Sequence, residues 1–345
     1  MLPAIVALFG VLTLIALGWL ARLRLRHAAR PVGRLVDVGG RRVHLLEAGD
    51  GPTVVLVGGT WAPAVSWSRV IDVLRASARV VAWDRPGLGW SEPAEAPRTP
   101  SVMADELDAT LRAAGVARPV VLVGHSFGGV VARIFAARHR SDVAGVVLLD
   151  AAHETQFERF PEPIRRMARQ MGGMMPRVLG LAAHAVSLGF VALRPGVLDG
   201  ILAGAGALSH TTRAALRARI ATDPSVLRTM AREMRDLLPG YAEARELGLG
   251  PGSLGALPLR VISHGRAEGA PPSLGPDVAA AYEATWQALQ LEQAALSSRG
   301  RRTVAEGVGH DIPNEAAELV GVAVKEVLIE AATPGVDRQQ AVAVA

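Results

Sequence analysis

Short runs of β-branched and aliphatic residues alternate with helix-forming segments along most of the chain from Val32 onward. Several runs are apolar at every position, which is the pattern of strands buried on both faces. Strands and helices in alternation predict an α/β fold with a mainly parallel sheet and helices on both sides. The eight predicted strands are 35–38, 43–46, 54–57, 80–83, 120–123, 143–149, 259–262 and 303–305.

Helix patterns fall between these strands. The first two strands are joined across Gly39-Gly40 and are predicted to form an antiparallel hairpin. The predicted helices of the sheet domain are 65–77, 101–114, 127–139, 277–297 and 315–331.

The alternation stops after residue 149 and resumes near residue 259. The intervening segment, 151–256, is helix-prone and rich in Arg, Ala, Leu and Met, with predicted breaks at Pro176, Pro195 and Pro239. We interpret it as a helical cap that divides the sheet domain into residues 32–150 and 257–332. Residues 333–345 show no periodicity and are predicted to be a flexible tail.

The N-terminus carries an apolar run over residues 2–20, followed at once by several arginines. About 20 apolar residues are enough to span the hydrocarbon core of a membrane. We predict a transmembrane anchor over residues 1–21 and a basic linker over residues 22–31. A cleaved signal sequence and a soluble helix are the alternatives, although a signal sequence normally carries positive charge before its apolar run. The positive-inside rule predicts that the main domain lies in the cytoplasm.

The formal net charge is +5 and the isoelectric point about 10.7. The basic residues are spread along the chain beside acids, and Lys325 is the only lysine, so no nucleic-acid partner is expected. The chain has no cysteine, which excludes disulfides, zinc–thiolate sites and a cysteine nucleophile.

The segment Gly124-His-Ser-Phe-Gly128 directly follows the apolar strand 120–123 and opens a predicted helix. A G-x-S-x-G sequence in this strand–turn–helix setting predicts a nucleophile elbow. The turn exposes the hydroxyl of Ser126, and the positive end of the next helix faces the charge that develops on the substrate. Ser126 is therefore the candidate nucleophile.

A serine hydroxyl attacks well only when a base takes its proton. His310 follows the last predicted strand, within Gly307-Val-Gly-His310, and precedes the last helix. The other histidines fall in the cap, in the membrane-proximal segment, on an early strand, near a helix end or beside the nucleophile. His153 and His264 follow strands and are the two others that could approach the site. We therefore predict His310 as the base.

Four motifs together resemble the α/β-hydrolase superfamily. They are Gly58-Gly59-Thr60, Asp84-Arg-Pro-Gly-Leu-Gly-Trp-Ser91, the Ser126 elbow and Gly309-His310, in the order typical of that superfamily. The chain is similar to its cap-bearing, serine esterase-like branch over about residues 32–331. The resemblance implies an oxyanion hole made by the backbone amides of Phe127 and Thr60.

The acid that orients the histidine has two candidates. Many relatives carry an aspartate after the strand that corresponds to 259–262, but this chain has no aspartate there and offers only Glu268. Other relatives take the acid from the end of the preceding strand, which in this chain ends at Asp150. That position lies at the same sheet edge as Ser126. We predict Asp150, with Glu268 as the alternative.

The predicted reaction is hydrolysis of a carboxylic ester through an acyl-enzyme, with no metal or cofactor needed. The apolar-rich cap and the predicted anchor suit an apolar or lipidic ester. Three alternatives remain: a carbon–carbon bond hydrolase or perhydrolase, a thioesterase or amidase, and a non-catalytic module that binds an apolar ligand. An aspartate in place of Ser126 would have indicated haloalkane or epoxide hydrolysis.

Overall fold

The computed structural model describes residues 2–202, 208–268 and 270–333. Eight strands form one sheet in the order β1-β2-β4-β3-β5-β6-β7-β8. β1 pairs with β2, and β2 with β4, in antiparallel fashion, and the other neighbours are parallel. The strands are β1 (Arg34–Val38), β2 (Arg41–Ala48), β3 (Thr53–Val57), β4 (Arg79–Trp83), β5 (Val120–His125), β6 (Val143–Leu149), β7 (Leu259–His264) and β8 (Gly300–Ala305).

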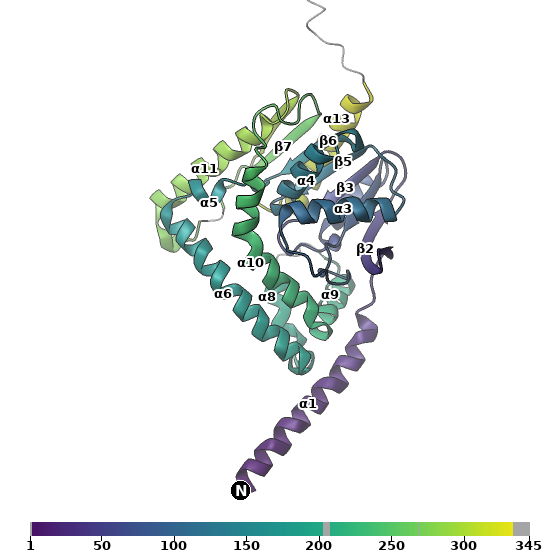
Figure 1. The fold of residues 1–345 in the computed structure, drawn as a ribbon, viewed down its shortest axis with the longest axis vertical. Coiled ribbons are helices and arrows are strands. Elements are labelled where there is room, and N and C mark those ends of the chain that lie inside the picture. Colours follow the sequence, from purple (N-terminus) through teal and green to yellow (C-terminus); the bar gives the residue numbers. More distant parts are fainter. Residues whose placement is uncertain (1, 203–207, 269, 334–345) are drawn as a thin grey trace, which may run out of the picture.

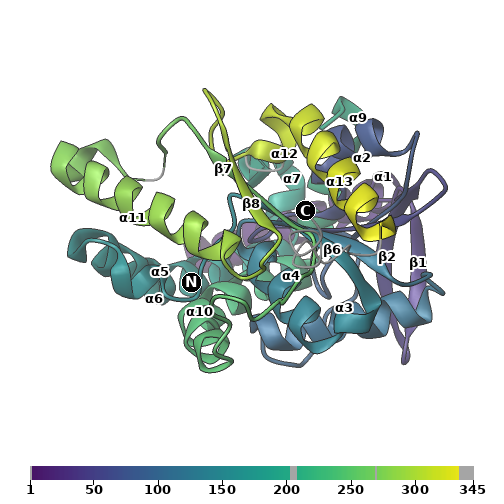
Figure 2. The ribbon, with the colours of Figure 1, turned by 90° about the horizontal axis from the view of Figure 1, so that it is seen from above.

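Both faces of this sheet are covered, which explains why β3 is buried at every position. On one face, α3 and α4 contribute Met103, Leu107 and Ile134 to the core. On the other, α2 and α13 contribute Val70 and Val324; Figure 2 shows α3 and α13 on opposite sides of the strands. The predicted eight-stranded, mainly parallel α/β architecture and its N-terminal hairpin are confirmed. The helices of this part are α2 (Ser68–Leu74), α3 (Pro100–Ala113), α4 (Phe127–Arg138), α11 (Pro276–Ala294), α12 (Ile312–Glu315) and α13 (Ala317–Ala332).

Between β6 and β7 the chain forms a layer of helices that Figure 1 shows to one side of the sheet. No strand occurs in the described part of this segment, which we refer to as the cap. The two long helices α6 and α10 pack against each other. The cap helices are α5 (Gln156–Arg159), α6 (Glu162–Ser187), α7 (Phe190–Leu193), η3 (Pro195–Leu198), α8 (Asp199–Leu202), α9 (His210–Thr222) and α10 (Pro224–Glu246).

The predicted breaks at Pro176 and Pro239 are wrong, because Pro176 lies inside α6 and Pro239 inside α10. An interior proline removes one backbone hydrogen bond and disfavours a helix by about 3 kcal/mol. The long contact between α6 and α10 outweighs this local preference. Pro195, by contrast, does begin a new element, η3.

The N-terminal helix α1 (Leu2–Ala28) extends beyond the apolar run, through most of the segment predicted as a linker. It is the one helix in the described ranges that is long and apolar enough to cross a membrane; a signal sequence would pass the same test. Its first part projects away from the body (Figure 1), and its last part packs against α7 and α9. The predicted tail lies almost wholly outside the described residues, which end at Thr333.

Candidate active site

Ser126 occupies a tight turn between β5 and α4. Its φ of 52° and ψ of −125° define a backbone conformation that a non-glycine residue adopts only at a cost in conformational energy. Gly128 permits the turn, because a Cβ at this position would collide with the carbonyl groups of Val57 and Gly58. The hydroxyl of Ser126 is thereby held beyond the carboxyl end of β5.

The imidazole of His310, in the loop after β8, lies between Ser126 and Asp150. Its Nε2 is 3.1 Å from the Ser126 Oγ, and its Nδ1 is 2.6 Å from the Asp150 Oδ2. With the proton on Nδ1, the imidazole donates to Asp150 and accepts from the serine hydroxyl. This arrangement lets His310 take the proton of Ser126 while Asp150 holds the imidazole ring in place.

Asp150 follows the last residue of β6, with a φ of 41° and a fully buried side chain. Its Oδ1 accepts hydrogen bonds from the Trp286 Nε1, at 2.8 Å, and from the backbone N–H of His264, at 3.1 Å. Its Oδ2 accepts from His310 and from the His264 Nδ1, at 2.8 Å. Burial alone would raise the pKa of Asp150, but the hydrogen bonds from His264 and His310 hold that pKa far below its usual range. Asp150 is therefore ionised at neutral pH.

Glu268 contacts the backbone of His310. Its Oε2 accepts from the His310 N–H at 3.0 Å, and its Oε1 pairs with Arg266 at 2.7 Å. These bonds lower the pKa of Glu268, the bond from the His310 backbone most of all. Of the two candidate acids, the structure brings Asp150 to the imidazole of His310 and Glu268 to its main chain.

The loop after β3 faces the nucleophile from the other side. A Cβ on Gly59 would lie 3.1 Å from the Ser126 Cβ, and Thr60 lines the same cavities as Ser126. Phe127 is the first residue of α4, where backbone N–H groups have no partner within the helix. The structure thus gathers Thr60 and Phe127 around Ser126.

Two cavities adjoin Ser126, of about 430 Å³ and about 400 Å³. The first lies under the cap. Its apolar wall is formed by Phe157, Leu237, Tyr241, Tyr282 and Trp286, and its polar wall by Gln156 and the polar residues described above. The second lies against Trp67 and Pro313. A substrate bound at Ser126 therefore has room on both sides of the reacting atom.

The model of the α/β-hydrolase fold family matches residues 52–311. The chain belongs to this family. Among solved structures, an epoxide hydrolase, CorEH, shares the fold with a TM-score of 0.65 at 20% identity, over 87% of this chain and 99% of that one. A putative lipase from Acinetobacter baumannii has a TM-score of 0.57 at 16% identity, over 91% of this chain and 96% of that one.

Curated relatives of this α/β-hydrolase include enzymes with different reactions. It is 34% identical to a 2-hydroxymuconate semialdehyde hydrolase from Pseudomonas over 35% of this chain and 44% of the relative. It is 29% identical to a haloalkane dehalogenase from Sphingobium indicum over 40% of this chain and 49% of the relative. The chain spans less than half the length of each of these relatives, so the match identifies a family of hydrolases but does not identify the substrate of this chain.

Sequence reasoning missed Glu283 and Trp286 of the α/β-hydrolase site, and it did not predict the role of His264. His264 ends β7, and its Nε2 lies 3.0 Å from the carboxylate of Glu283, while its Nδ1 binds Asp150. Glu283 and Trp286 come from α11, a helix whose position over β7 no local pattern reveals. Burial opposes protonation of His264, but the bonds to Asp150 and Glu283 raise its pKa to about 9. A ring that donates to two carboxylates carries both protons, so His264 is a buried cation beside the site.

The Asp84–Ser91 segment, one of the four motifs of the resemblance, makes a contribution that the sequence did not predict. The guanidinium of Arg85 donates to the carbonyl groups of Gly58 and Gly59, each at 2.7 Å. It also pairs with Glu233 of α10 at 3.0 Å, and both side chains are buried. Arg85 thus braces the loop that carries Thr60 and ties that loop to the cap.

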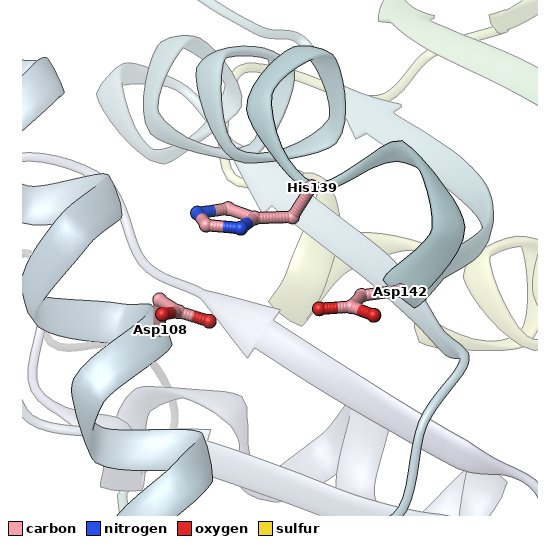
Figure 3. A group of neighbouring side chains, drawn as sticks. All are labelled: Asp108, His139 and Asp142. Carbon is pink, nitrogen blue, oxygen red and sulfur yellow. The ribbon is translucent and has the colours of Figure 1, made fainter.

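One group of neighbouring metal-ligating side chains occurs among the described residues, away from Ser126. It consists of Asp108, His139 and Asp142 (Figure 3). Arg118 pairs with both carboxylates, and Arg112 pairs with Asp108 at 2.9 Å. These cations already balance the two negative charges, so we assign the group to surface ion pairs.

Proposed function

We propose that the protein is a serine hydrolase that cleaves carboxylic esters through an acyl-enzyme. The observation that carries this proposal is the hydrogen-bonded series from Ser126 Oγ to His310 Nε2 and from His310 Nδ1 to Asp150. Ser126 is the nucleophile, His310 the general base and then the general acid, and Asp150 the group that orients the ring and stabilises its cation.

In the first half of the reaction, His310 takes the proton of Ser126 as the Oγ attacks the ester carbonyl carbon. The amides of Thr60 and Phe127 are aimed at the oxygen on which negative charge develops. His310 then gives its proton to the departing alcohol. In the second half, His310 takes a proton from water as its oxygen attacks the acyl carbon. His310 then gives that proton to the Ser126 Oγ as the bond from the Oγ to the acyl carbon breaks, which releases the carboxylic acid and restores Ser126 and His310.

The substrate class follows from the cavity under the cap. Its aromatic wall suits an apolar acyl or alcohol group, and the apolar helix α1 suits a source of substrate in a membrane. We therefore propose an apolar or lipidic ester. Hydrolysis of epoxides and haloalkanes by an alkyl-enzyme needs an aspartate nucleophile, and Ser126 stands at that position.

A carbon–carbon bond hydrolase is the second candidate, supported by the similarity to a 2-hydroxymuconate semialdehyde hydrolase. The same serine and histidine would serve that reaction. A panel of esters graded by acyl length, with a thioester, an amide and a vinylogous diketone, distinguishes the two. Fastest turnover of the diketone would favour the second candidate.

We further propose that α1 anchors the protein in a membrane as a single span. Its apolar residues precede Arg22, Arg24 and Arg26, so the positive-inside rule puts the catalytic domain in the cytoplasm.

A fluorophosphonate probe, which reacts covalently with activated serines, tests the catalytic assignment. Wild-type protein is expected to be labelled, and Ser126→Ala, a change that removes only the hydroxyl, is expected not to be. Absence of labelling in the wild type, or equal labelling of Ser126→Ala, would contradict the proposal.

A further inference from the structure

α1 meets the cap through two glycines in direct contact. A Cβ on Gly18 would lie 2.8 Å from the carbonyl carbon of Gly189, so neither position has room for a side chain. Gly189 has a φ of 86° and leads into α7. The backbone of α1 therefore touches the turn between α6 and α7.

Arg22, one helical turn further on, fixes this contact. Its guanidinium donates to the carbonyl groups of Ser187, at 2.9 Å, and Thr222, at 2.7 Å, at the ends of α6 and α9. The Arg22 side chain is buried in the cap. Because the charge is bonded to two helix ends, α1 and the cap are held in one fixed relation.

With α1 as the membrane span proposed above, this relation fixes the depth of the cap relative to the membrane. Trp19 is exposed (51%) at the end of the apolar run, and the arginines follow it. Tryptophan and arginine mark the boundary between the hydrocarbon core and water. Gly18 therefore lies at that boundary, and the contact brings Gly189 and the start of α7 to the same level.

The cap surface around Gly189 carries several exposed apolar side chains, with the exposed His184 on the same face of α6 as Leu181. Leu188 and Phe190 flank Gly189, Leu193 ends α7, and Val197 lies in η3. Leu181 precedes Leu188 by two turns of α6 and shares its face. An exposed apolar surface of this kind marks an interaction site in a soluble domain. We refer to Leu181, Leu188, Phe190, Leu193 and Val197 as the cap apolar face.

We propose that the cap apolar face is inserted into the lipid leaflet that α1 enters. The proposal rests on the membrane anchoring of α1 proposed above. Arg194 is exposed beside Leu193, where a guanidinium would meet anionic headgroups. The cap is thus held on the membrane surface by α1, which spans the membrane, and by the cap apolar face beside it. Two membrane-binding elements together bind more firmly than either one alone.

Site-specific labelling tests this placement, because the wild-type chain has no cysteine to be removed. The probe is a thiol-linked fluorophore in full-length protein reconstituted into vesicles of phosphatidylcholine and phosphatidylglycerol that carry nitroxide-labelled lipids. Leu193→Cys samples the cap apolar face, and Leu14→Cys samples α1. Val322→Cys on α13 is the matched control, since Val322 is an exposed aliphatic residue (54%) at the far end of the molecule from α1 (Figure 1).

Quenching at positions 14 and 193, with none at 322, is the expected result. Quenching at 14 without quenching at 193 would overturn the docking of the cap and leave the anchor in place. Absence of quenching at both positions would overturn the anchor and the docking together.

Activity gives a second measurement. The double variant Leu188→Ser/Leu193→Ser should lose several-fold of its rate on a long-chain ester embedded in vesicles and keep its rate on a dissolved short-chain ester. Val322→Ser should change neither rate. An equal loss on both substrates would contradict docking and point to a disturbed cap.

Discussion

Asp150 accepts four hydrogen bonds through two oxygens, and two of the four donors are imidazoles. A carboxylate held in this way cannot rotate, so the direction of its bond to His310 is fixed. The indole of Trp286 and the backbone of His264 hold one oxygen, which leaves the other to the two rings.

Exchange of the two acids for their amides separates their contributions. Asp150→Asn should reduce turnover of a chromogenic ester by about 10⁴-fold, because the amide favours the wrong tautomer of His310. Glu268→Gln keeps an oxygen for the His310 N–H and should change turnover only a few-fold. If Asp150→Asn kept near wild-type turnover and Glu268→Gln lost its turnover, Glu268 and not Asp150 would be the acid that orients His310.

The protonation of His264 predicts a dependence of stability on pH. Its pKa is raised from 6.5 to about 9 in the folded protein, so its stabilising effect is complete below about pH 6.5 and is lost as the pH rises through 9. A shift of this size corresponds to about 3 kcal/mol in the free energy of unfolding. Urea denaturation of the detergent-solubilised protein between these pH values should show this decrease. The variant His264→Gln should show a weaker dependence of the unfolding free energy on pH. An unchanged pH dependence in that variant would refute the protonation of His264.

How far single residues could be predicted depends on how local their signals are. Ser126 lies within a five-residue motif in a strand–turn–helix setting, and His310 follows the last strand, so both could be chosen from sequence. Asp150 could be chosen because the end of a parallel strand has a known place at the sheet edge. Glu283 could not, because its contact with His264 depends on how α11 packs over β7.

Among the elements, the conformation of the loop after β3 depends on a cationic side chain, Arg85, which follows β4. Arg85 follows β4 closely and donates to two carbonyl groups of that loop, while Glu233 reaches it from α10. Gly58 and Gly59 have no side chain that could brace this loop, so the guanidinium supplies the brace.

Variants on the two sides of this ion pair should differ in severity. Arg85→Met leaves Glu233 buried without its partner and frees the loop, which should cost about 3–5 kcal/mol in unfolding free energy and abolish ester turnover. Glu233→Gln keeps the bonds from Arg85 to the loop and should lose less of both. The measurements are urea denaturation and turnover of a short ester. Equal losses in the two variants would show that the brace acts through the cap alone.

Elements could be predicted where one local pattern decided them. The strands were found because burial on both faces makes them continuously apolar, as in β3 and β5. The cap was recognised as helical, but its helices were divided wrongly at Pro176 and Pro239. Proline propensity is a local property, and the α6–α10 contact that overrides it joins segments far apart in the chain.

For the whole molecule, anchoring by α1 predicts where the protein is found after cell fractionation. The full chain should sediment with membranes and resist extraction by alkaline carbonate. Added protease should leave the catalytic domain intact in sealed right-side-out vesicles and digest it in inverted ones. A soluble, uncleaved chain would refute the anchor, and a shortened soluble chain would indicate a cleaved signal sequence.

The cap joins two neighbouring strands of the sheet. β6 and β7, the strands before and after it, are parallel, so the chain leaves the sheet at the carboxyl end of β6, where the N–H of Asp150 binds the carbonyl of Ile262 at 2.7 Å, and returns at the amino end of β7, where the N–H of Val146 binds the carbonyl of Pro258 at 2.9 Å. A connection of this kind can be exchanged without changing the register of either strand. Evolution can therefore replace the cap as a module and alter substrate choice while Ser126, His310 and Asp150 stay in place. A transplanted cap would need to keep Glu233, since its partner Arg85 belongs to the sheet domain.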